Sequence, residues 1–280
     1  MINPLHRQKQ CGFTLVEMIV VIVITGILGG IVAVFMRTPI QMYVDGTGRA
    51  ELSDIADLSV RRMAREIRLA VPNSVRVRDG TVVEFVPTKA GGRYLATEDG
   101  QPAANPVLDF HNAANLDFTV VGNMPTGRQA IKSGDFIVVF NAGTAPGNVY
   151  SVTPGAMNRA TVGAVNGSVV SLLDNPFSAQ EPRLPHPASR FLVANQPVSF
   201  ACAGGSLLRY TGYGFSADQA LVPGGTQTVL ATNVVSCNFN YSVSVGVNAA
   251  LLTMTLVLER ASGRDGPITL TQQVHVENTP

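Results

Sequence analysis

The chain has 280 residues and a formal net charge of +1. This length suffices for one membrane helix and one further domain of roughly 200 residues. A domain of that size can bury a core without disulfides or metals to hold it. Lysine occurs only at positions 9, 89 and 132, so the composition excludes the dense lysine patch that follows a nucleic-acid backbone, and only local arginine clusters stay open.

A short polar leader precedes a long apolar run at the N-terminus. Residues 18–36 carry no formal charge, and a helix needs roughly 20 apolar residues to cross hydrocarbon. The leader ends at Gly12, ahead of this run, whereas a secretory signal is cut after its apolar part. We therefore expect residues 1–12 to be removed and residues 13–37 to be kept as a transmembrane segment. The basic residues of the leader predict a cytoplasmic N-terminus, with the bulk of the chain outside the cytoplasm.

Glu17 lies at the head of this segment, where a charge costs about 2–3 kcal/mol on insertion scales. Such a cost indicates a partner or a function. Residues 12–17 read Gly-Phe-Thr-Leu-Val-Glu and lead directly into the apolar helix. This arrangement resembles the prepilin signal of type IV pilins and of type II secretion pseudopilins. The alternative is an ordinary single-pass anchor with a chance acidic residue at its edge.

The resemblance implies one processing event and one assembly contact. In this family a membrane-bound prepilin peptidase cuts after the glycine and methylates the new N-terminus, which implies cleavage between Gly12 and Phe13 and N-methylation of Phe13. The family glutamate matches Glu17, and its implied role is to pair with the N-terminal amine of a neighbouring subunit. A carboxylate and an ammonium are each costly alone in hydrocarbon, and their attraction grows as the dielectric falls, so assembly would relieve both penalties.

Residues 38–72 continue the helix, with a kink expected near Pro39 because proline removes a helix hydrogen bond. Residues 49–70 show a helical spacing of apolar residues. Opposite charges four residues apart, Asp57 with Arg61 and Arg62 with Glu66, support this helix on its polar face. The apolar stripe consists of Leu52, Ile55, Ala56, Met63, Ile67 and Ala70.

From residue 73 onward the pattern changes to the alternation of β-strands. The Asp79-Gly80 pair between two alternating runs predicts a β-hairpin over residues 74–87. In residues 251–259 every second side chain is apolar, so one face of that strand is expected to pack on the helix or on a second sheet. Further strands are expected at 116–121, 135–140, 168–173, 190–193, 198–202, 207–210, 228–235, 237–243 and 268–276. Loops rich in Gly, Pro, Ala and Asn are expected at 89–106, 142–148 and 180–189. The expected fold is α+β and pilin-like: a long N-terminal helix, half transmembrane and half amphipathic, packed on an antiparallel β-sheet domain of residues 73–280.

Cys202 and Cys237 form a lone pair, because the third cysteine, Cys11, lies in the leader. Their spacing matches no CxxC redox or zinc pattern. In an oxidising compartment we expect a disulfide, which the loop-entropy model values at about 3–4 kcal/mol of stability.

The C-terminal region carries a second, narrower resemblance. Residues 61–77, 202–214, 233–239 and 272–280 look like MshO-type minor pilins of the mannose-sensitive haemagglutinin (MSHA) pilus, which are related more distantly to PilW-type minor pilins and J-type pseudopilins. Residues 89–180 carry no recognisable string. The resemblance implies that the chain works with a prepilin peptidase, the major pilin, other minor pilins, the inner-membrane assembly platform and inner-membrane lipid, and that a separate ATPase supplies the energy.

The sequence shows no motif for catalysis. The histidines have no metal-ligand spacing, Ser206 lacks the frame of a nucleophile elbow, and no nucleotide-binding loop occurs. Asp109 and Asp117 on neighbouring strands are more typical of edge-strand charges than of an acid-base pair. We expect no enzyme activity, no cofactor and no metal.

Arg209, Tyr210 and Tyr213 raise one binding alternative, because guanidinium and aromatic groups on a loop can stack on bases or sugars. The competing interpretation is a packed strand end near the disulfide. No confident nucleic-acid binding follows.

The sequence thus predicts a minor pilin of an MSHA-type pilus, acting in initiation or tip assembly of the fibre. It would be a single-pass inner-membrane protein with a periplasmic C-terminal domain, and later part of the pilus at the cell surface. The alternatives are a minor pseudopilin of a type II secretion system, a tip adhesin or DNA-binding minor pilin, and a membrane-anchored enzyme.

Overall fold

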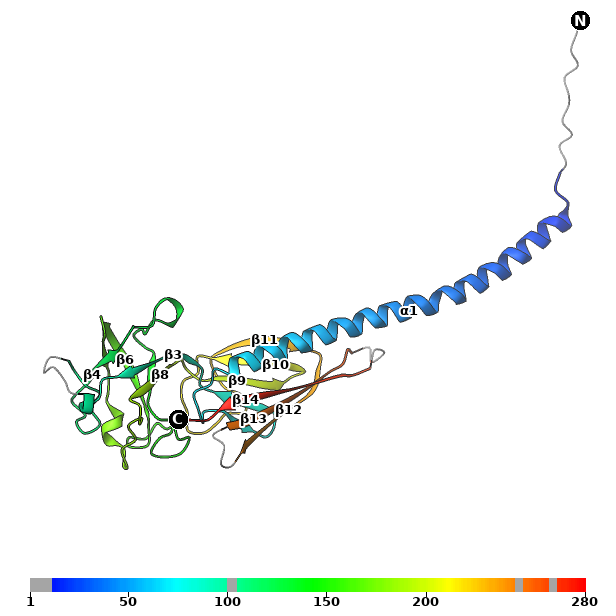
Figure 1. Ribbon diagram of the computed structural model, residues 1–280. Helices are drawn as coiled ribbons and strands as arrows, with labels where there is room; N and C mark the ends of the chain where they lie inside the picture. The colour runs from blue at the N-terminus through cyan, green and yellow to red at the C-terminus, as the bar shows by residue number, and fades with distance from the viewer. Residues whose placement is uncertain (1–11, 100–104, 245–248, 262–265) are drawn as a thin grey trace, which may run out of the picture. The chain divides into compact units, whose positions relative to one another are not determined.

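The computed structural model describes residues 12–99, 105–244, 249–261 and 266–280. The chain divides into two compact units, Met1–Glu51 and Leu52–Pro280. Helix α1 (Leu15–Ile67) runs through the end of the first unit and the beginning of the second (Figure 1).

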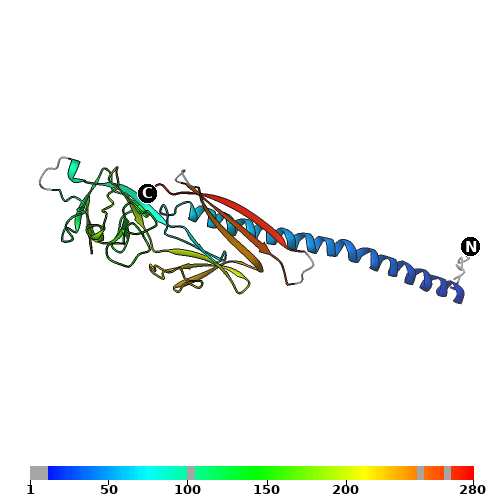
Figure 2. The ribbon, with the colours of Figure 1, turned by 90° about the horizontal axis from the view of Figure 1, so that it is seen from below.

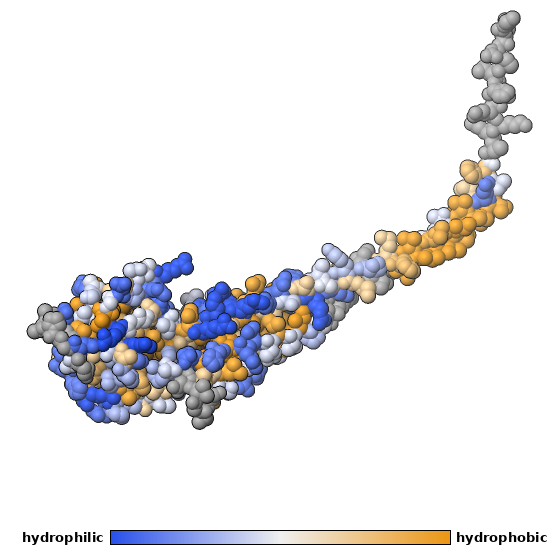
Figure 3. Space-filling view, in the orientation of Figure 1, coloured by the Kyte–Doolittle hydropathy of each residue, from blue (hydrophilic) through white to orange (hydrophobic). Residues whose placement is uncertain are grey.

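The described part of the N-terminal unit is the leading portion of α1. The helix assignment continues without interruption past Pro39, so the kink expected there stays a prediction. Apolar side chains cover this portion, seen as the orange band in Figure 3. Within the chain none of them is packed: Leu15, Ile22 and Leu28 are all more than half exposed.

The C-terminal unit contains two antiparallel sheets and a closed barrel (Figures 1 and 2). The five-stranded sheet has the order β1 (Arg76–Arg78), β2 (Val82–Phe85), β9 (Val198–Ala203), β10 (Ser206–Thr211), β11 (Thr226–Thr232). The three-stranded sheet has the order β12 (Val234–Ser244), β13 (Ala249–Leu258), β14 (Ile268–Glu277). The barrel has the order β3 (Thr88–Tyr94), β4 (Asp117–Val121), β7 (Val169–Leu172), β6 (Arg159–Asn166), β5 (Phe136–Val138), β8 (Arg190–Ala194). Short 3-10 helices are η1 (Thr97–Asp99), η2 (Gly127–Gln129) and η3 (Pro176–Ala179).

The last four turns of α1 form the centre of the main core. Leu52, Ala56, Met63 and Ile67 are almost fully buried, and they belong to one apolar cluster with residues of both sheets. Alternate residues of β13, from Leu252 to Leu258, are buried in the same cluster. The predicted helix stripe and the predicted apolar strand face are therefore confirmed. Both expected ion pairs of the polar face are present as well.

The barrel is inserted between two neighbouring strands of the five-stranded sheet. Phe85 at the end of β2 pairs with Val198 at the start of β9, and the chain between them forms the barrel. Its first and last strands, β3 and β8, pair with each other. The barrel has an apolar core of its own, centred on Phe118, Phe177 and Phe191.

The comparison with the predicted strands shows two errors. The β1–β2 hairpin has the predicted Asp79-Gly80 turn, with Arg78 opposite Val82, and the other predicted strands occur close to their expected positions. However, β3 lies in the segment expected to be a loop at 89–106, and β6 was not predicted. Part of that segment, residues 100–104, lies outside the described residues. The expected α+β, pilin-like fold class is confirmed, since the end of the long N-terminal helix packs against antiparallel β-sheets; the strands form two sheets and a barrel.

Glycines explain both errors. A β-carbon on Gly92 of β3 would lie 2.6 Å from the Phe191 ring, and one on Gly163 of β6 would lie 2.8 Å from Leu173. Glycine in a strand weakens the sequence signal but permits the close approach of another side chain. The two strands are therefore held by barrel packing rather than by their own propensity.

Candidate functional site

The first candidate site is the start of α1, where Thr14 and Glu17 bond to each other. The Glu17 backbone N–H donates to Thr14 Oγ1 at 3.3 Å, and the Thr14 N–H donates to Glu17 Oε2 at 3.5 Å. This reciprocal arrangement is a capping box, which satisfies two helix N–H groups that otherwise have no partner. Both contacts are long and therefore weak. They turn the Glu17 carboxylate back toward Phe13, without engaging it strongly.

Gly12 and Phe13 precede the helix and are exposed, Phe13 by 81%. The peptide bond between them is therefore in non-helical, accessible backbone, which is what a peptidase needs. The rest of the predicted leader, residues 1–11, lies outside the described residues. By length and composition alone, α1 can cross a membrane.

The N-terminus also shows similarity to known proteins. Residues 7–33 match the prokaryotic N-terminal methylation motif. This match contains Gly12, Phe13 and Glu17, and it makes the N-terminus type IV pilin-like or pseudopilin-like. The motif implies processing by a prepilin peptidase and assembly with other pilins. No curated protein and no solved structure matches the chain.

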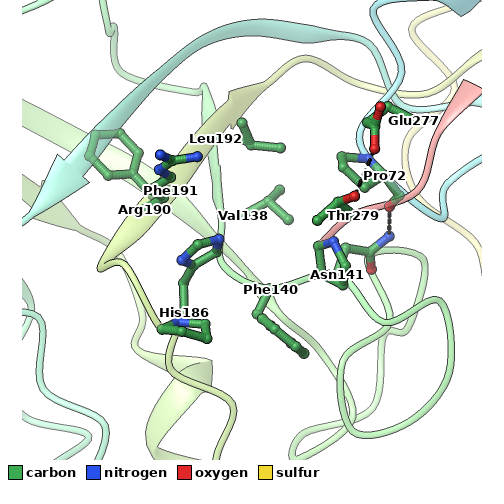
Figure 4. A pocket seen from close by; sticks show the side chains of 12 residues that line it. Pro72, Val138, Phe140, Asn141, His186, Arg190, Phe191, Leu192, Glu277 and Thr279 are labelled. Atoms are coloured by element: carbon green, nitrogen blue, oxygen red, sulfur yellow. Dashed lines mark hydrogen bonds between the residues drawn. The ribbon is translucent and has the colours of Figure 1, made fainter. Parts of the chain in front are cut away.

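The second candidate site is a pocket of about 620 Å³ where the barrel meets the C-terminal residues. Figure 4 shows His186 and Arg190 on one side and Glu277 and Thr279 on the other. Apolar walls come from the barrel and the loop after β5: Val138, Phe140, Phe191 and Leu192. A mostly apolar cavity with a few polar groups is the general form of a small-molecule site.

The polar groups of this pocket differ in whether they are available to bind a ligand. The Asn141 amide donates to Pro72 O at 2.6 Å and accepts from Val149 N at 2.9 Å, so it is already used. His186 Nδ1 accepts from the Ala188 N–H at 3.0 Å. Burial lowers the pKa of His186, so its ring is neutral at pH 7. A ligand would therefore meet one neutral imidazole, one cation in exposed Arg190, and one carboxylate in exposed Glu277, which accepts from the Thr279 hydroxyl at 2.7 Å.

A smaller pocket of about 450 Å³ shares His186 and Pro187 with the first pocket. Asp109 is one of its lining residues. The Asp109 carboxylate accepts from the backbone N–H groups of His111 and Asn112, and from Asn115 Nδ2 at 2.6 Å. These bonds close a loop, so Asp109 has a structural role rather than a pairing with Asp117. Among the described residues no group of three or more His, Cys, Asp or Glu side chains could hold a metal.

Arg209, Tyr210 and Tyr213 do not form an exposed stacking surface. Tyr210 is buried, and Arg209 Nε bonds Glu66 Oε2 at 2.9 Å. The Tyr213 hydroxyl donates to Glu84 Oε1 at 2.9 Å. The structure therefore favours the packed strand end.

Tyr213 belongs to a buried polar cluster that the sequence reasoning missed. Glu84 is 3% exposed and bonds Arg76 Nε at 2.5 Å. The Arg76 guanidinium lies 3.7 Å from the centre of the Tyr150 ring, and the Tyr150 hydroxyl donates to Ser74 O at 2.8 Å. Because Arg76 and Glu84 face each other in the β1–β2 register, the predicted hairpin turn already contained the signal for this pair.

The predicted disulfide between Cys202 and Cys237 is present. Cys202 lies in β9 and Cys237 in β12. The bond therefore joins the five-stranded sheet to the three-stranded sheet and fixes the two layers around the core.

Proposed function

We propose that this chain is a minor pilin of a type IV pilus of the MSHA kind, and that it acts in the initiation or tip assembly of the fibre. The observation that carries the proposal is the methylation motif, with Glu17 at the head of a helix whose leading portion is apolar and exposed. The MshO-like strings at residues 61–77, 202–214, 233–239 and 272–280 support the narrower assignment.

The mechanism follows from the charges at the helix start. Cleavage after Gly12 leaves a free amine on Phe13, to which the peptidase then transfers a methyl group from a methyl donor. In the bilayer this amine pairs with Glu17 of an adjacent subunit, since both charges are costly when buried alone. The capping contacts of Glu17 are long, so little intrachain bonding is lost when the carboxylate turns to a neighbour. The protein is anchored in the inner membrane with its C-terminal unit in the periplasm, has no catalytic role of its own, and depends on the assembly platform and a separate ATPase.

The test is mass spectrometry of the N-terminus in cells with and without the prepilin peptidase, together with a Glu17→Ala variant scored for pili. We expect peptidase-dependent N-methyl Phe13 and loss of pili in the variant. Asp54→Ala, which removes an exposed acidic residue of the same helix outside the motif, is the matched control and should keep pili. An intact Met1 in both strains would leave only a membrane anchor.

Deletion of the gene distinguishes a minor pilin of a pilus from a minor pseudopilin of a secretion system. Loss of secreted enzymes with pili retained would indicate a minor pseudopilin. Turnover of a substrate by the purified chain would indicate a membrane-anchored enzyme.

A tip adhesin is the second candidate, because the pocket beside the barrel offers a cavity with exposed Arg190, a cation that has no ion-pair partner among the described residues. In that case Arg190→Ala reduces adhesion while piliation is unchanged. The control is Arg128→Ala on the exposed η2 turn of the barrel region. Equal adhesion of both variants would contradict a role for this pocket.

A further inference from the structure

Strand β14 has an unpaired outer edge. Among the described residues it pairs only with β13, over a ten-residue strand whose register runs without a shift from Ile268 opposite Leu258 to Glu277 opposite Ala249. In the part of the chain that the structure describes, the backbone N–H and C=O groups along the outer edge have no strand partner. Natural edge strands are usually shortened, bulged, or protected by proline or lysine. β14 contains no proline, lysine or bulge, and its one formally charged residue is Glu277 at its end.

An open groove of about 460 Å³ lies between β14 and helix α1. Its helix side carries Arg61, Arg65 and Arg68, together with Leu58 and Ala64, and β14 contributes Gln272. Figure 2 shows β14 passing alongside the end of the helix.

The three arginines form a row on one face of the helix, because they are spaced by four and three residues. All three are exposed. Arg61 is paired with Asp57 at 2.6 Å. Arg65 and Arg68 lie near the end of the helix. Neither has an ion-pair partner among the described residues. Leu58 is 69% exposed at the other end of the groove and offers an apolar contact.

We propose that this groove binds an extended acidic segment of another protein, which adds to β14 as a further strand. The edge requires a partner with free backbone groups, which a helix lacks because its own groups are already bonded. The arginine row requires carboxylates. Successive same-side residues of a strand are about 6.7 Å apart, and Arg61 and Arg65 are about 6 Å apart along the helix axis. Acidic residues at alternate positions of the added strand therefore meet successive arginines.

The acidic segment comes from a different protein, not from a second copy of this chain. Among the described strands, none carries two acidic residues at alternate positions. The inference does not depend on the proposed function, since it rests on the edge and the groove of the C-terminal unit alone.

The test uses the full chain in detergent micelles and the peptide Thr-Glu-Val-Glu-Val-Thr-amide, which carries fluorescein on its N-terminal amine in place of an acetyl group. Fluorescence anisotropy measures binding, and hydrogen exchange with mass spectrometry locates it. We expect protection of the β14 amides on peptide addition, with no change in β11, which is an edge strand of the five-stranded sheet. Arg65→Glu should weaken the Kd at least tenfold, and Arg128→Glu, with the same change in net charge, should leave it unchanged.

Two results would overturn the proposal. One is the absence of β14 protection at millimolar peptide. The other is undiminished binding by both of two peptides of the same sequence, one with N-methylated valines and one with N-methylated glutamates. Successive N–H groups of a strand point to opposite edges, so strand addition needs one of these two sets, whereas simple charge attraction needs neither. Arg65 is exposed, so its variant should fold; Arg68→Gln gives a second, milder variant, for which we expect a smaller loss of affinity in the same assay.

Discussion

Replacing Glu84 by glutamine tests the buried polar cluster that also contains Arg76, Tyr150 and Tyr213. The Glu84 side chain is 4% exposed and that of its partner Arg76 is 22% exposed. Glu84→Gln keeps the shape but leaves the arginine charge without its carboxylate. Breaking a buried pair in this way costs about 3–5 kcal/mol. We expect the lower end of that range, because Arg76 still donates to Ala217 O at 2.7 Å and to Ser216 O at 2.9 Å.

The assay is urea unfolding of the full chain in micelles, followed by near-ultraviolet circular dichroism of its six tyrosines, since the chain has no tryptophan. Asp57→Asn is the control, because it breaks an ion pair whose side chains are 72% and 44% exposed and should cost under about 0.5 kcal/mol. The double variant Arg76→Met with Glu84→Gln should be less destabilised than the sum of its single changes. A loss below about 1 kcal/mol for Glu84→Gln, or one equal to the control, would refute the reasoning on burial.

Three further outcomes follow from contacts described above. Replacing Cys202 and Cys237 together by serine should lower the free energy of unfolding by about 3–4 kcal/mol, and an unchanged urea midpoint would show that the two sheets do not need this link. Thr14→Ala removes the capping oxygen, a loss of about 1 kcal/mol at the helix start; hydrogen exchange of the first-turn amides in micelles should rise, with Thr25→Ala as the control. Burial lowers the pKa of His186 below its unfolded value of 6.5, so the unfolded chain takes up the proton first as the pH falls. The stability present above pH 6.5 is then lost as the pH drops through the folded pKa, and His186→Gln should show a smaller decrease in urea midpoint between pH 7.5 and pH 5.

The local elements were predictable because their signals are short-range. The apolar stripe from Leu52 to Ile67 and the Asp79-Gly80 turn depend on residues only a few positions apart, and both predictions are confirmed. The same holds for Thr14 and Glu17, whose spacing is that of a capping box, although sequence reasoning assigned Glu17 only an assembly role.

The barrel was not predictable from such signals. Its closure depends on pairings such as Ala90 with Val193, which no local pattern reports. Gly92 of β3 looks like a loop residue until the Phe191 ring that occupies the space of its β-carbon is known. The pocket was missed for the same reason, since its walls come from segments as distant as Val138 and Pro280.

The position of the barrel has a consequence for how the chain folds. Pairing of Phe85 with Val198 must close a loop of roughly 110 residues, which costs about 3 kcal/mol more than closing a four-residue turn. Folding of the barrel first removes this cost, because the pairing of β3 with β8 brings both ends of the loop together. We therefore expect the barrel to fold first and to hold the ends of β2 and β9 together while the five-stranded sheet forms. For the same reason, a short turn in place of residues 86–197 would leave β2 and β9 as a simple hairpin, so the barrel is a module that can be exchanged without changing the order of the strands around it.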